Sequence, residues 1–119
     1  MTKVNYDEEL KKIDDRIIQL ENEVKMGKAL DELHEDPRFI LIMQEGYFDA
    51  EEKRIAELLF NPTALKREQL ENLMDKTTAI RNTKQYYNTI QINANMAPDQ
   101  IKDEETYRKE LVDRGVDDE

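Results

Sequence analysis

Apolar residues separated alternately by three and four positions run through residues 6–35, and no other feature constrains the fold as strongly. This spacing places them on one face of an α-helix that pairs with a neighbouring helix, as in a coiled coil. Charged residues occupy most positions between them, so the stripe is narrow and suits a single neighbouring helix. At Gly27, the next seam position, we expect the pairing to loosen and the helix to kink or to meet a different neighbour. The predicted seam, which is also the predicted interface between copies of the chain, consists of Leu10, Ile13, Ile17, Leu20 and Val24.

A second long helix is predicted over residues 65–95, which contain no glycine or proline. Its apolar stripe is weaker, because Thr77, Thr83 and Lys84 stand where a strong seam has aliphatic side chains. The first helix can pair with this helix in the same chain or with a copy of itself, since the same stripe serves either arrangement. The predicted face carries Leu70, Leu73, Thr77, Ile80, Tyr87, Ile90 and Ala94.

The segment between the long helices contains two helix starts and two helix ends. Asp36 and Pro37 suit the N-cap and the first position of a short helix, and Gly46 suits a left-handed end. Asp49 has the spacing of a capping box for another short helix, which must end before Pro62. The predicted short helices cover residues 37–45 and 49–60.

The first of these short helices is apolar nearly all round, so we expect it to be buried on most sides. Its apolar side chains include Phe39, Ile40, Ile42 and Met43.

Together these patterns predict an all-α fold. We expect a helical hairpin of two long helices with two short helices between them and coiled-coil-like packing. Residues 1–98 are predicted to form one helical domain. Beyond the break expected at Pro98, residues 99–119 form an acidic C-terminal helix or tail, with a weak helix over residues 99–113 and a frayed end.

Charge and composition narrow the possible partners. The chain has 119 residues and a net charge of −10, so phosphates repel it as a whole, and we do not expect direct nucleic acid binding. It contains no cysteine, which excludes disulfides and thiolate metal sites. The N-terminus is charged from the start, and no stretch is apolar enough to span a membrane. We therefore expect a soluble protein without a membrane partner.

The sequence contains no constellation typical of catalysis. The single histidine, His34, cannot supply the two histidines of a helical di-metal site, and we interpret it as a residue that suits the C-terminal end of a helix. Glycine-rich phosphate loops, nucleophile elbows and Ser/His/Asp sets are absent. We therefore predict no enzymatic activity and no catalytic, cofactor-binding or metal-binding residues.

Four residues are predicted to contact a partner protein. Tyr47 follows Gly46 at the expected helix break, and Tyr86 lies off the apolar phase of its helix, so each hydroxyl group suits a wet edge. Arg81 and Lys84 belong to residues 65–95, where five basic residues outnumber three acidic ones. This basic face can simply neighbour the acidic first helix, or it can dock an acidic partner or a phosphate.

The central pattern resembles small uncharacterised proteins of tailed bacteriophages that are encoded near head and packaging genes. The resemblance rests on Asp36-Pro37-Arg38-Phe39, Glu45-Gly46-Tyr47-Phe48, Glu51 to Arg54, Leu58-Leu59 and Pro62. It covers the central third of the chain and the start of the following helix, and it brings no assigned functional residues. It implies a phage origin and a role in virion assembly.

Three functions follow as hypotheses. The first is a non-enzymatic head, connector or scaffold-like component that self-associates through its long helices and contacts other virion or assembly proteins. The second is a phage-encoded inhibitor that binds a host protein or a small charged ligand, its acidic segments imitating a nucleic acid backbone. The third is a DNA-packaging adaptor that uses the basic face. The expected location is the host cytoplasm or the virion.

Overall fold

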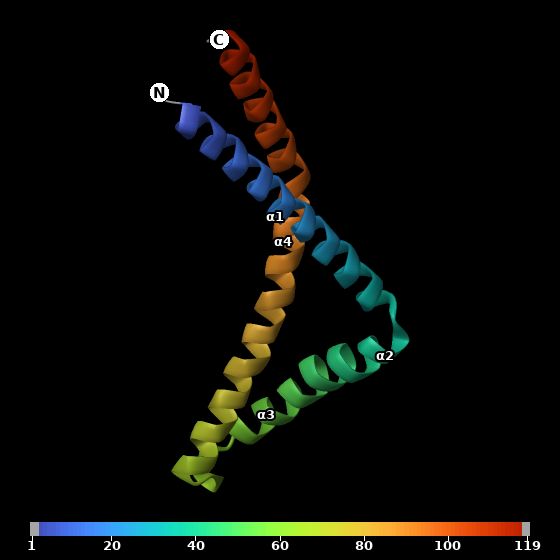
Figure 1. Ribbon diagram of the computed structural model, residues 1–119. Helices are drawn as coiled ribbons and strands as arrows, with labels where there is room; N and C mark the ends of the chain where they lie inside the picture. Colours follow the sequence, from blue (N-terminus) through green and yellow to red (C-terminus); the bar gives the residue numbers. More distant parts are fainter. Residues whose placement is uncertain (1–2, 118–119) are drawn as a thin grey trace. The chain divides into compact units, whose positions relative to one another are not determined.

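The computed structural model describes residues 3–117, which are helical apart from short turns and contain no strand (Figure 1). The all-α prediction is therefore confirmed. The elements are α1 (Lys3–Glu35), α2 (Pro37–Phe39), the π-helix η1 (Ile40–Glu51), α3 (Glu52–Leu59), the 3₁₀ turn η2 (Pro62–Ala64) and α4 (Arg67–Asp117).

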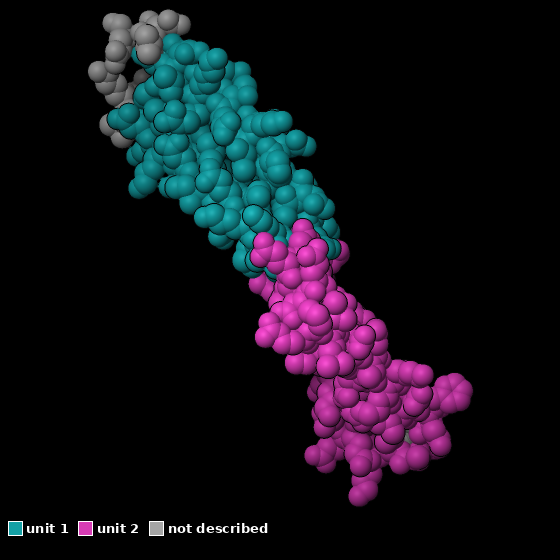
Figure 2. Space-filling model, turned by 90° about the vertical axis from the view of Figure 1, so that its right-hand side faces the viewer, with its two compact units in different colours: residues 1–29, 90–119 teal, residues 30–89 magenta. Residues whose placement is uncertain are grey.

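The chain divides into two compact units (Figure 2). Residues 1–29 and 90–119 form unit 1, in which the two long helices pack against each other, and residues 30–89 form unit 2. The domain boundary predicted at residue 98 lies inside α4, and residues 99–117 belong to the same unit as the N-terminal helix.

In unit 1, α1 and α4 lie close together at Gly27. A Cβ atom at this position would lie 3.7 Å from Ala94 Cα and closer still to Ala94 Cβ. The expectation that the pairing loosens at Gly27 is therefore wrong, whereas the expected change of neighbour agrees with the assignment of α1 residues 30–35 to unit 2. The missing side chain lets the two backbones approach, so that glycine tightens the contact instead of interrupting it.

Further contacts connect the same two helices. Arg108 Nε donates a hydrogen bond of 2.8 Å to Asp14 Oδ1. Nearer the C-terminal end of α4, a Cβ atom at Gly115 would lie 2.6 Å from the hydroxyl oxygen of Tyr6. Among the described side chains of unit 1, the buried apolar ones are Ile13, Leu20 and Ala97.

In unit 2, the segment formed by η1 and α3 lies along the first part of α4. Ile55 of α3 forms a buried cluster with Leu73 and Ile80 of α4. An ion pair of 2.5 Å between Glu52 Oε2 and Lys84 Nζ joins α3 to α4. Four half-buried side chains pack around the cluster: Tyr47, Phe48, Leu59 and Leu65.

The helical segment that follows α1 begins at Pro37, as predicted. Asp36 is extended, with φ −75° and ψ 119°, and its side chain accepts a hydrogen bond from the Arg38 amide at 2.9 Å. Pro37 occupies the first helical position.

The two predicted short helices are instead one helical segment from Pro37 to Leu59. Gly46 does not end a helix, because no glycine among the described residues has a positive φ. Asp49 is not an N-cap, since it lies inside η1. Packing of Tyr47 and Phe48 against the unit 2 cluster keeps this stretch helical, as tertiary contacts often override local propensity.

The expectation that this segment is buried on most sides is also wrong. Leu41 and Ile42 remain about two thirds exposed, at 64% and 65%. Within unit 2 the segment packs on α4 along one side, so the opposite side of the apolar run stays uncovered.

The predicted break at Pro98 is absent, and α4 runs through it. Pro98 itself is exposed, but the preceding Ala97 is fully buried in unit 1. Packing around this position therefore holds the helix together despite the lost backbone hydrogen bond. The predicted helices over residues 65–95 and 99–113 are thus one element, and residues 118–119 of the predicted tail lie outside the described residues.

Candidate interaction site

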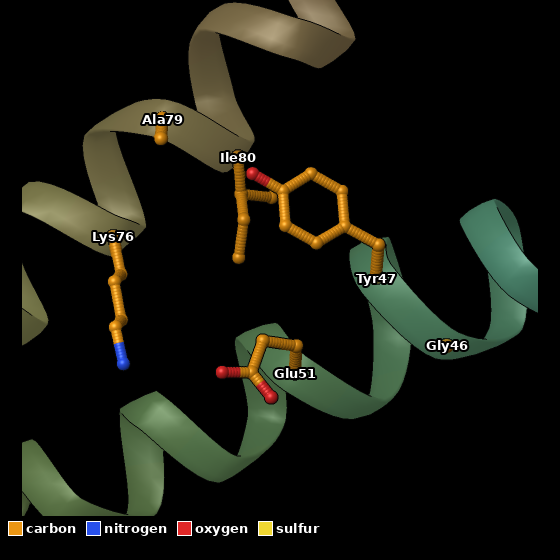
Figure 3. A pocket seen from close by; sticks show the side chains of 6 residues that line it. All are labelled: Gly46, Tyr47, Glu51, Lys76, Ala79 and Ile80. Carbon is orange, nitrogen blue, oxygen red and sulfur yellow. The ribbon is translucent and has the colours of Figure 1, made fainter.

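A hollow of about 430 Å³ opens on unit 2 between η1 and α4. It is lined by Gly46, Tyr47 and Glu51 from η1 and by Lys76, Ala79 and Ile80 from α4. Figure 3 shows the Tyr47 ring beside the Ile80 side chain at one end, with Glu51 and Lys76 pointing toward one another at the other end. This η1–α4 hollow therefore combines an apolar wall with a charged rim.

The carboxylate at the rim is held in place by its own element. Arg54 donates from Nε to Glu51 Oε2 at 3.1 Å and from Nη2 to Glu51 Oε1 at 2.5 Å. These hydrogen bonds, together with the positive charges of Arg54 and Lys76, lower the pKa of Glu51 from its ordinary value. Among the described side chains, Lys76 forms no ion pair. The rim thus presents one cation that can meet a negative group on a partner.

An aromatic cluster lies next to the hollow in the same unit. The Tyr87 ring is 5.9 Å from Phe39 and 6.0 Å from Phe48, measured between centroids and with edge-to-face geometry. His34 stacks at a tilt on Phe39, with centroids 5.4 Å apart. These rings are only half-buried, so the cluster both fills the unit and exposes aromatic edges.

Three of the four predicted contact residues lie around this cluster. Tyr47 packs against Phe48 with centroids 5.6 Å apart, and Lys84 places its ammonium group 5.5 Å from the Phe48 centroid. Tyr86 is exposed and lies against Tyr87. Arg81, in contrast, points to solvent and joins none of these contacts. Their role as partner contacts stays a prediction.

The residues of the predicted seam on α1 differ in how deeply they are buried. Ile13 and Leu20 are buried within the chain, Leu10 and Ile17 are half-buried, and Val24 remains 37% exposed. The chain's own α4 therefore covers part of the stripe, but with residues 90–117; of the face predicted over residues 65–95, only Ile90 and Ala94 lie in unit 1. The predicted interface between copies stays a prediction.

The most exposed large apolar side chain among the described residues was not predicted. Phe60 follows the last residue of α3 and is 91% exposed. The position of Pro62 two residues later marks a helix end in the sequence, but it does not indicate that the preceding ring lacks a neighbour. The pairing of Glu51 with Arg54 is visible in the sequence as a spacing of three residues, whereas the facing Lys76 depends on the tertiary fold.

Two kinds of feature, metal-binding clusters and membrane-spanning helices, are not found in the part of the chain that the structure describes. No group of three or more His, Asp or Glu side chains there is arranged to hold a metal ion. No helix within residues 3–117 has the length and apolar character needed to cross a membrane.

No protein-family model, curated protein or solved structure shows detectable similarity to the chain. The resemblance to phage proteins therefore stays a prediction, and the function is argued from the geometry of unit 2 and from the exposed surface.

Proposed function

We propose that the chain is a non-enzymatic structural or assembly protein of a tailed bacteriophage, such as a head, connector or scaffold-like component. It acts through self-association and through contacts with other virion or assembly proteins, in the host cytoplasm or in the virion. The resemblance of the central third to small phage proteins supports the origin. The exposed apolar side chains support self-association and contact with other proteins.

The observation that carries the proposal is the 91% exposure of Phe60. A large aromatic side chain in water gains free energy when a partner covers it, and aromatic residues are enriched among the anchors of protein interfaces. Other large apolar side chains are also well exposed, namely Ile18, Leu41, Ile42, Met74 and Tyr86. A protein that works through contacts with other chains would bury such side chains on assembly.

In the folded chain, the surface available for contact between copies differs from the seam predicted on α1. Because α4 already covers Ile13 and Leu20, an oligomer built on the whole predicted seam would require α1 and α4 to separate. Contact through exposed apolar side chains requires no such rearrangement. The hairpin-like pairing of the long helices then serves as a scaffold that presents these surfaces.

Light scattering on a sizing column tests the proposal. The mass of the protein should exceed that of one chain, 14.1 kDa, and should depend little on ionic strength, because apolar contacts are not screened by salt. A mass of one chain at every concentration, at low and at high salt, would contradict self-association.

A second candidate is an inhibitor that imitates a nucleic acid backbone toward a basic host protein. The acidity of unit 1 favours it, since residues 1–29 and 90–119 contain sixteen acidic and ten basic residues. Such a complex would weaken steeply as salt is added. Salt-resistant capture of a partner would argue against this mechanism.

A further inference from the structure

We propose that Phe60 of one copy inserts into the η1–α4 hollow of a second copy, so that the chain associates head to tail. This inference rests on the proposed self-association and specifies its contact. Both surfaces belong to unit 2, so every copy carries one protruding ring and one hollow.

The protruding ring is held on an ordered helix end. The Phe60 amide donates a hydrogen bond of 3.0 Å to the Ala56 carbonyl, and the residue keeps helical angles of φ −64° and ψ −25°. Its backbone is thus already fixed before a partner binds, although its side chain is exposed. A preorganised anchor loses less conformational freedom on binding than one carried by a flexible loop.

The hollow suits an aromatic side chain. Its volume of about 430 Å³ falls in the range of roughly 300–1,000 Å³ typical of pockets that enclose small organic ligands. Tyr47, Ala79 and Ile80 supply an apolar wall, and Gly46 adds no side chain to fill the space. An entering ring can pack against the Tyr47 ring in the edge-to-face or offset arrangement that aromatic pairs prefer.

Charge complementarity indicates that the partner of the η1–α4 hollow is a second copy of the same chain. Glu57 lies three residues before Phe60 and therefore on a neighbouring part of the same helix surface. Among the described side chains, Glu57 and Lys76 each take part in no ion pair. When Phe60 enters the hollow, Glu57 can reach the Lys76 ammonium group at the rim, which fixes the orientation of the incoming helix.

The contact joins two different surfaces of the chain. Each copy can offer its ring to one neighbour and its hollow to another, and the assembly then closes into a ring or grows as a filament. A reciprocal two-fold dimer, in which each copy inserts its ring into the hollow of the other, uses the same two surfaces.

Two blocking variants test the inference, with masses measured by light scattering. Phe60→Ser removes the ring, and Ala79→Phe fills the hollow from an exposed position. Each variant alone should remain a single chain at concentrations where the unaltered protein associates. An equimolar mixture should form a discrete species of twice the mass, because one intact ring still meets one intact hollow.

Ile92→Ser serves as the matched control, because Ile92 is an exposed apolar residue that does not line the hollow. It should associate as the unaltered protein does. Circular dichroism and unfolding midpoints establish that each variant is folded. Association of Phe60→Ser and Ala79→Phe at the unaltered level would overturn this contact while leaving self-association intact, whereas a monomeric unaltered protein would overturn both.

A charge exchange tests the orientation independently. Glu57→Lys and Lys76→Glu should each weaken association by about tenfold, since each places like charges opposite one another. Both substitutions in one chain should restore it, because each copy then presents the reversed pair to the next. A double variant that associates as poorly as the single variants would contradict the pairing.

Discussion

Asp36 lies between α1 and α2 and caps the start of α2. Its side chain interacts with one neighbour, Arg38. Its carboxylate accepts hydrogen bonds from Arg38 Nε at 3.1 Å and Nη2 at 2.9 Å, as well as from the Arg38 amide. The guanidinium hydrogen bonds are the main reason that the pKa of Asp36 falls from 3.8 to about 2. All of these partners lie within two residues, so a local sequence pattern was sufficient to predict the cap.

The lowered pKa of Asp36 predicts acid-sensitive stability. Because the carboxyl group binds its proton less readily in the folded chain, its contribution is present above pH 3.8 and is lost as the pH falls toward about 2. Arg38→Met should return the pKa of Asp36 toward its ordinary value and flatten this part of the stability profile. NMR titration of the carboxyl carbon and urea unfolding from pH 2 to 6 measure both effects, and an unchanged titration in the variant would contradict the assignment.

At the scale of elements, the contact between α1 and α4 depends on one missing side chain. Gly27→Ala would place its methyl group against Ala94. Overpacking costs about 1–3 kcal/mol, whereas alanine in place of glycine gains up to about 1 kcal/mol in helix propensity. We therefore expect Gly27→Ala to lower the free energy of unfolding in urea, and the added Ala94→Gly substitution to recover part of the loss by reopening the space. Stabilisation by Gly27→Ala alone would argue against the close approach.

A substitution at Pro98 tests whether α4 is continuous at this position. The proline removes a backbone donor inside the helix, and its exposed ring contributes no core contact. Pro98→Ala should therefore raise the free energy of unfolding by about 1–3 kcal/mol, since alanine restores the hydrogen bond and a favourable helix propensity. Thermal and urea unfolding provide the measurement. An unchanged or lower stability would indicate that the helix is interrupted at this residue in solution.

At the scale of the whole molecule, the net charge of −10 acts against the folded chain. Repulsion among carboxylates is greater in a compact chain than in an extended one, and salt screens it. The ion pairs are exposed, so their own weakening in salt has a small effect.

Sodium chloride should consequently raise the free energy of unfolding between low and moderate ionic strength. Asp103→Lys combined with Glu105→Lys makes the net charge less negative at two exposed positions, and this variant should respond less to salt. Urea unfolding at several salt concentrations measures the difference. A stability that falls with salt would show that the ion pairs dominate over the repulsion.

The sequence was sufficient for features that depend on near neighbours. The three-and-four spacing of Ile13, Leu20 and their companions predicted a long helix, and Asp36 with Pro37 predicted the start of the next helical segment. These features reflect helix periodicity and capping, which act within a few residues.

Only the tertiary structure decided the features that depend on which surfaces meet. Gly46 and Pro98 carry strong local tendencies to end a helix, yet packing of neighbouring side chains keeps both stretches helical. The partner of the α1 stripe, the hollow beside Ile80 and the exposure of Phe60 all follow from where α4 lies. Burial is a property of contacts between residues far apart in the chain, so periodicity alone predicts that a face is apolar but not what covers it.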